Sequence, residues 1–146
     1  MSIEFSHTIE VSRSPAEVFA FVDDLGKTPS WLERCTGIEK LTSGENAVGT
    51  KLRYSYADGG RKGQMDGEIT HRVPGEHLSF EYRDKMMAVT VDFRMAKSDA
   101  GTRLTHTVDI RPQTFMSKLF SPMIRRALPT QTMTAMEKLR GLLEQK

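Results

Sequence analysis

The chain lacks most of the features that mark a specialised class of protein. Its 146 residues include one cysteine, Cys35, so an internal disulfide is excluded and a reducing compartment is expected. No apolar run approaches the roughly 18 residues that a membrane-spanning helix needs. The first residues alternate apolar and polar side chains and do not resemble a secretory leader. We therefore predict a cytoplasmic protein without an integral membrane segment.

The charge balance also excludes some partners. The chain has 21 lysines and arginines against 19 aspartates and glutamates, an excess too small to predict nucleic-acid binding. We interpret the adjacent Arg125 and Arg126 as a solvated helix face, with a phosphate or membrane contact as the lesser alternative. A hydrophobic content of 38% and a charged content of 27% are typical of one globular domain, here residues 1–146. The composition indicates no oligomeric state.

Sequence motifs of known catalytic sites are missing as well. The chain has no nucleophile elbow, phosphate-binding loop, dinucleotide fingerprint, H-E-x-x-H pair or C-x-x-C pair. A zinc site needs three or four ligands, and no carboxylate or thiol obviously joins the histidines. We therefore predict no cofactor and no metal, and we expect the thiol of Cys35 to be inert.

What is present is a clear change of hydrophobic period along the chain. Residues 3–11 alternate as in a half-buried strand. A capping box from Ser14 to Glu17 then starts one helix, and Thr28-Pro29 starts a second short helix that carries Trp31. Runs typical of strands and hairpins follow between about residues 36 and 112, at 38–41, 52–56, 65–73, 78–82, 89–95 and 104–110.

The last part of the chain returns to the helical period, with apolar residues at helical spacing from Phe115 to Leu143. Pro122 and Pro129 lie in this stretch, so we expect a long helix that is kinked or broken near one of them. A single sheet with one apolar face must cover that face, and this helix is the only element long enough. The predicted fold is therefore α+β, with an antiparallel sheet of six or seven strands curved around the C-terminal helix.

Several motifs resemble one known superfamily. The opening strand, Ser-Pro-Ala-Glu-Val-Phe at 14–19, Trp31, Val-Gly-Thr at 48–50 and the terminal helix are similar to START-like SRPBCC proteins, which have the helix-grip fold. Within that superfamily the chain most resembles the branch of polyketide cyclases/dehydrases and lipid-transport proteins, over its whole length. The resemblance implies a cavity between sheet and helix. Members bind lipids, sterols, quinones, hormones or polyketides, and some are enzymes.

Polar residues on the covered face of the sheet are the candidate functional residues. His7, His71 and His106 fall on the apolar parity of their strands, where a histidine can hydrogen-bond a ligand or act as acid or base near neutral pH. An interior histidine with protein partners is the more common alternative. We name His71 and His106 as catalytic candidates. The predicted ligand-binding residues are these two histidines together with Trp31, Tyr54, Tyr56, Met65, Phe80, Tyr82, Phe93, Leu119 and Met123.

Three functions are compatible with this pattern. The first is binding of a small hydrophobic or amphipathic molecule, such as a lipid, quinone or polyketide, because tyrosines and methionines suit an adaptable apolar pocket. The second is an enzyme of the cyclase or dehydratase type, which the resemblance implies, with inward histidine and tyrosine as acid and base. The third is a protein-interaction module, whose signature is an exposed apolar patch on the outer sheet or the C-terminal helix.

Overall fold

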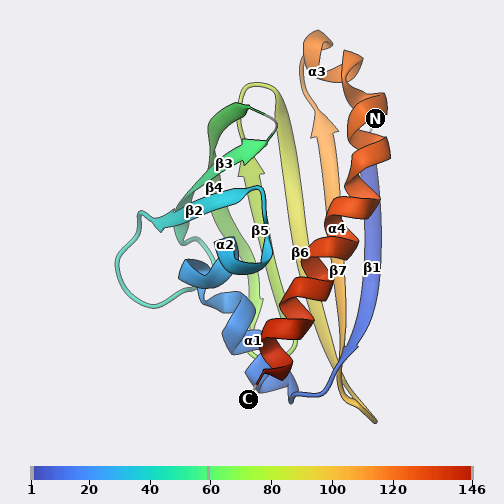
Figure 1. Ribbon diagram of the computed structural model, residues 1–146. Coiled ribbons are helices and arrows are strands. Elements are labelled where there is room, and N and C mark those ends of the chain that lie inside the picture. Colours follow the sequence, from blue (N-terminus) through green and yellow to red (C-terminus); the bar gives the residue numbers. More distant parts are fainter. Residues whose placement is uncertain (1, 59, 146) are drawn as a thin grey trace.

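Seven antiparallel strands form one sheet in the computed structural model, which describes residues 2–58 and 60–145 (Figure 1). The strands are β1 (Ile3–Val11), β2 (Cys35–Lys40), β3 (Lys51–Asp58), β4 (Arg61–Val73), β5 (His77–Arg83), β6 (Met87–Ser98) and β7 (Gly101–Pro112). Strands β2 to β7 pair consecutively as a meander, and β1 joins the sheet beside β7. The strand expected near residues 38–41 is confirmed as β2.

Two short helices follow β1, as predicted. They are α1 (Pro15–Asp23) and α2 (Thr28–Trp31), with the 3-10 turn η1 (Leu25–Lys27) between them. The capping box that starts α1 is present. The backbone N–H of Glu17 donates to the Ser14 hydroxyl at 3.2 Å, and the backbone N–H of Ser14 donates to the Glu17 carboxylate at 3.3 Å. These two bonds satisfy donors that a helix start otherwise leaves without a partner.

The C-terminal helix is broken, as expected, and the break lies just before Pro122. A short helix α3 (Phe115–Leu119) is followed by the long helix α4 (Ser121–Glu144), which has Pro122 in its first turn. Proline fits there because the first turn of a helix has no partner for its N–H groups. Pro129 lies inside α4 and does not end it.

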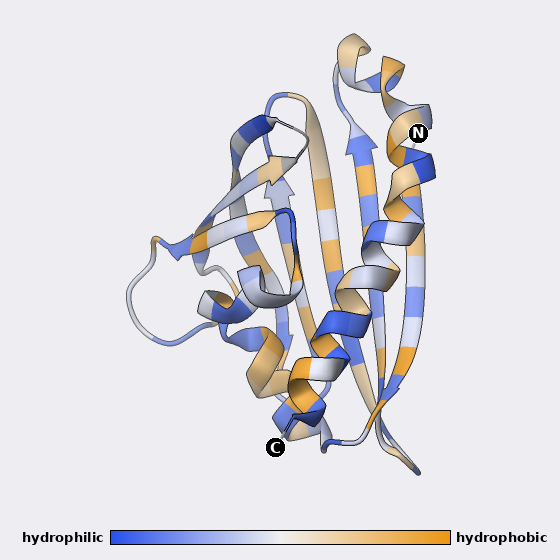
Figure 2. Ribbon diagram, in the orientation of Figure 1, coloured by the Kyte–Doolittle hydropathy of each residue, from blue (hydrophilic) through white to orange (hydrophobic). Residues whose placement is uncertain are grey.

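The long helix α4 crosses the concave face of the sheet, where it contacts β1 and α2 (Figure 1). Its larger buried side chains, Leu128, Met136, Leu139 and Leu143, are spaced as an amphipathic helix requires. The strands show the complementary pattern: orange and blue segments alternate along β6 and β7 in Figure 2, since one face of the sheet is covered and the other is wet. The predicted helix-grip fold is confirmed.

A bulge in β4 overturns one orientation that the sequence pattern predicts. The pairing of β4 with β5 shifts between Ile69 and His71, so the alternation of inward and outward side chains changes there. His71 is exposed and stacks on His77 of the outer face at 5.0 Å between ring centroids. The predicted inward orientation of His71 is therefore wrong.

The same bulge turns Arg72 toward α1, where it meets an aspartate for which the sequence suggests no role. The guanidinium of Arg72 donates to both carboxylate oxygens of Asp23, at 3.1 Å from Nε and 2.8 Å from Nη2. It also lies over the ring of Phe19, at 5.3 Å from the centroid. A two-point pair of this kind fixes orientation as well as contact, so the end of α1 is tied to the sheet.

Glycines in β4 make room for two tyrosines of the covered face. A Cβ added at Gly63 would lie 2.5 Å from the Tyr56 hydroxyl, and one added at Gly67 would lie 2.4 Å from the Tyr82 ring. Real Cβ atoms do not approach ring carbons so closely. The rings of these tyrosines therefore lie flat over the neighbouring strand because the strand has no side chain at those positions.

We predict that Gly67→Ala lowers the free energy of unfolding by about 1–3 kcal/mol, because the Tyr82 ring must move within a packed wall. Gly37→Ala in β2 is the matched control, since an added Cβ there has nothing within 4 Å. Urea unfolding of both variants measures the difference. Equal effects of the two substitutions would contradict this explanation of Gly67.

Candidate ligand-binding site

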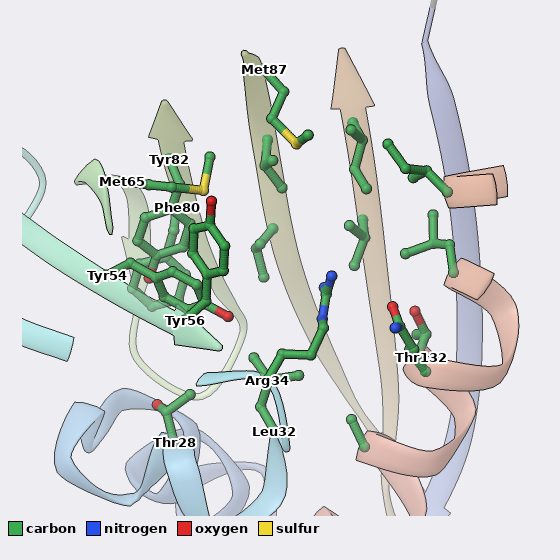
Figure 3. Close-up of a pocket in the computed structure, with 18 of the residues that line it drawn as sticks. Thr28, Leu32, Arg34, Tyr54, Tyr56, Met65, Phe80, Tyr82, Met87 and Thr132 are labelled. Carbon is green, nitrogen blue, oxygen red and sulfur yellow. The ribbon is translucent and has the colours of Figure 1, made fainter. Parts of the chain in front are cut away.

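A cavity of about 520 Å³ lies between the covered face of the sheet and α4 (Figure 3). Its volume is within the range of about 300–1,000 Å³ that small-molecule sites occupy. Val22, Leu25, Thr28 and Trp31 line it from the α1–α2 region. Large parts of the wall come from inward side chains of the sheet: Tyr54, Tyr56, Met65, Phe80, Tyr82, Val89, Val91, Phe93, His106, Val108 and Ile110.

The cavity opens toward solvent on the side away from α1. Arg61, Lys62, Met123 and Ala127 line it and are also exposed. The guanidinium of Arg61 lies 5.5 Å from the ring centroid of Phe120, so a cation–π contact joins the start of β4 to the junction of α3 and α4. One end of the cavity is thus closed by the short helices, and the other lies beneath this junction.

The structure brings nine of the eleven predicted ligand-binding residues into the cavity wall. They are Trp31, Tyr54, Tyr56, Met65, Phe80, Tyr82, Phe93, His106 and Met123. His71 and Leu119 are not among the lining residues. His71 faces outward because of the bulge in β4, and Leu119 is 57% exposed because α3 turns this side chain away from the sheet.

One wall of the cavity is aromatic. The ring centroid of Tyr82 lies 4.9 Å from that of Tyr54 and 5.9 Å from that of Phe80. Figure 3 shows these rings, from β3 and β5, gathered beside Met65 of β4. Burial raises the pKa of Tyr82 well above its ordinary value, so its hydroxyl is neutral at physiological pH. The wall therefore offers broad ring faces and the neutral hydroxyl of Tyr82.

A second row of rings runs from the short helices to β7. Phe93 stacks on His106, with ring centroids 4.4 Å apart, and meets Trp31 edge-on at 5.9 Å. Burial lowers the pKa of His106 to about 4, so the imidazole is neutral near pH 7. Within the described part of the chain, neither ring nitrogen of His106 nor Nε1 of Trp31 has a hydrogen-bond partner. Buried polar groups of this kind are uncommon in proteins.

The sequence pattern missed several polar groups of the cavity. Arg34 comes from the irregular segment between α2 and β2, and Figure 3 shows its side chain extending into the cavity. Nothing in the hydrophobic period marked that position. Thr132 and Gln131 line the cavity from α4, and Thr132 is 4% exposed. Thr132 lies one helical turn after Leu128 and one turn before Met136, so it shares their inward face of α4. This spacing could have identified it from the sequence.

Within residues 2–58 and 60–145, no three histidine, cysteine, aspartate or glutamate side chains are grouped as a metal site requires. Nor does any helix in these ranges have the length and apolar character needed to cross a membrane. Burial raises the pKa of the Cys35 thiol to about 11, so the thiol is protonated at physiological pH.

A curved antiparallel sheet, a long helix across it and a cavity between them define a START-like helix-grip protein. More particularly, the chain belongs to the family described as polyketide cyclase / dehydrase and lipid transport, whose sequence profile matches residues 2–144. No curated protein matches the chain.

Solved structures of low sequence identity share this fold. The Zhui aromatase/cyclase from Streptomyces sp. R1128 has a TM-score of 0.82 at 13% identity, with 99% of this chain and 94% of that chain covered. A START superfamily protein from Mycobacterium smegmatis has a TM-score of 0.80 at 16% identity, with 97% of each chain covered. Ara h 8.0201 has a TM-score of 0.72 at 12% identity, with 98% of each chain covered.

The depressed pKa of His106 predicts a specific loss of stability in acid. Between pH 6.5 and about 4 the imidazole of His106 is protonated in the unfolded chain and neutral in the folded chain. The contribution of His106 to the free energy of unfolding is therefore complete above pH 6.5. It falls by about 3 kcal/mol as the pH is lowered to about 4. His106→Phe keeps the stacking on Phe93 and should remove this loss.

Urea unfolding across that pH range measures the effect. His71→Gln is the control and should keep the wild-type loss, because this exposed side chain lies on the outer face, outside the cavity wall that contains His106. A His106→Phe curve parallel to that of the wild type would show that another group is responsible.

Proposed function

We propose that the protein binds a small hydrophobic or amphipathic molecule inside the cavity between the sheet and α4. The observation that carries this proposal is the cavity of about 520 Å³ in what would otherwise be the packed centre of the domain. Protein interiors are normally close-packed, and an unfilled space forfeits contacts on every wall. A ligand that fills the space with apolar surface restores those contacts.

The polar groups of the wall support a ligand with at least one hydrogen-bonding oxygen, such as a lipid, quinone or polyketide. Among residues 2–58 and 60–145, Nε1 of Trp31 and the ring nitrogens of His106 have no hydrogen-bond partner. A buried donor left unpaired is destabilising by about 1–3 kcal/mol. A ligand carbonyl or hydroxyl would offset that cost. The nitrogens of Trp31 and His106 are buried in the cavity wall, so each ring must rotate before its nitrogen can contact a ligand.

Binding is tested with lipids, quinones and aromatic polyketides by thermal shift and native mass spectrometry. We expect at least one class to raise the unfolding temperature and to form a 1:1 complex. Val91→Phe projects a ring into the cavity from β6 and should lower the affinity for that ligand by about tenfold or more.

Arg94→Phe is the matched control, since it places the same ring on the exposed side of the same strand. Affinity that is equally reduced in both variants would argue against the cavity as the site. The absence of any shift across the three ligand classes would argue against the function itself.

A cyclase- or dehydratase-type reaction is our second proposal, and His106 is the observation that favours it. Its imidazole is neutral above about pH 4 and belongs to the cavity wall, so it is available as a general base near neutral pH. A poly-ketone held in one folded shape needs little more than such a group to cyclise. His71, on the outer face, takes no part in this proposal.

A cytoplasmic location stays a prediction.

His106→Phe should abolish turnover of a poly-ketone substrate and leave its binding within about threefold of the wild type, because the ring stack is retained. Product formation by mass spectrometry and affinity by calorimetry separate the two effects. His71→Gln serves as the control with full turnover. Undiminished turnover in His106→Phe would remove this residue from the mechanism.

A further inference from the structure

The outer side of α3 and the start of α4 are apolar and uncovered. Phe115, Met116, Leu119 and Met123 have exposed fractions of 74%, 53%, 57% and 69%. These four residues, called the apolar tip below, are half of the eight large apolar side chains found exposed in the described part of the chain. Figure 1 shows α3 projecting beyond the end of β7. A concentration of this kind marks an interaction surface, which single scattered apolar residues do not.

Phe115, Met116 and Leu119 of the apolar tip do not line the cavity. Ser117 is 1% exposed and lines the cavity, as does Phe120 at the helix junction. Within this segment, Ser117, Phe120 and Met123 therefore line the cavity. An ordinary surface helix is apolar on its inner side and polar on its outer side. The outer side here is apolar too, as on a helix that contacts a second apolar partner.

The charges within the segment that carries the apolar tip have one sign. Residues 113–136 contain Lys118, Arg125 and Arg126 and no acidic residue, although the whole chain carries nearly equal numbers of each sign. Arg126 follows Met123 by three positions and therefore lies on the same side of α4. The nearby turn before β6 adds Asp84 and Lys85, one charge of each sign. A partner with negative charge around an apolar interior is complementary to this surface.

The apolar tip is continuous with the opening of the cavity. Met123 is 69% exposed and also lines the cavity, so its side chain belongs to both surfaces. The backbone N–H of Gln113 donates to the carbonyl of Met86 at 2.8 Å, which holds the start of this segment beside the β5–β6 turn. The apolar tip therefore adjoins the cavity through the side chain of Met123.

We propose that the apolar tip inserts into the surface of an anionic lipid bilayer. Its four side chains would enter the boundary between head groups and acyl chains, while Lys118 and Arg126 pair with lipid phosphates. A second copy of the chain is a poorer partner. A two-fold symmetric contact through the tip would bring Lys118 and Arg126 of both copies into one interface, without an acidic residue of the segment to offset them. The docking goes beyond ligand binding and does not require that the cavity ligand be known.

The test is co-sedimentation of the full chain with two kinds of vesicle. One kind contains three parts phosphatidylcholine and one part phosphatidylglycerol, and the other contains phosphatidylcholine alone. We expect at least about tenfold tighter binding to the anionic vesicles, with affinity falling as salt is raised. Phe115→Ser with Met116→Ser should weaken binding to the anionic vesicles by about tenfold or more. Lys118→Gln with Arg126→Gln should remove the preference for anionic lipid.

Val48→Ser with Lys97→Gln is the matched control. It removes an exposed apolar residue, 62% accessible, and an exposed lysine at positions outside the tip segment, and it should bind like the wild type. Vesicle binding that the control loses as fully as the tip variants would overturn the proposal, as would no binding at low salt. Sedimentation velocity adds one further outcome: a dimer that Phe115→Ser with Met116→Ser disrupts, without vesicle binding, would assign the tip to self-association.

Discussion

The fold depends on how the far end of α4 is attached to the first corner of the chain. The backbone N–H and hydroxyl of Ser12 donate to the Glu144 carboxylate at 2.8 and 2.9 Å, and Arg13 donates to the carbonyls of Leu143 and Gln145 at 2.6 and 2.9 Å. The last carbonyls of a helix have no partner within it, and a cation there is favourable to the helix dipole. The corner between β1 and α1 supplies both the hydrogen-bond donors and the cation. It thereby fixes where the long helix ends on the sheet.

The position of the cavity follows from this attachment. Leu139 and Leu143 near the attached end join Ile9 and Val11 of β1 in the main core, so this end of the helix is packed. Toward its other end, α4 lies over strands whose inner face is wider than one helix can cover. The uncovered part of that face is the cavity, and the short helices close only one side of it. The same constraint that holds the helix on the sheet therefore leaves space for a ligand.

The sequence predicts most of the cavity wall because strand parity is a reliable guide wherever pairing is regular. Tyr54, Phe80 and His106 lie where alternation places them. The prediction for His71 failed because one bulge residue reverses the alternation, and composition alone does not reveal a bulge. Arg34 was missed because it lies between regular elements.

The break before α4 gives one segment two tasks. Phe120 and Ser117 cover the cavity from one side, while the apolar tip faces outward from the same two turns. A continuous helix from 115 to 144 would carry one apolar stripe along one line. The break at Phe120 lets the short helix α3 take a different direction, so residues that would extend the covered stripe become the exposed tip.

Leu119 belongs to the exposed tip, and its outward position follows from the break. Its assignment to the ligand site was the error that sequence periodicity, which assumes a single helix axis, was bound to make. The two tasks are therefore linked: whatever contacts the tip also bears on the segment that closes the cavity.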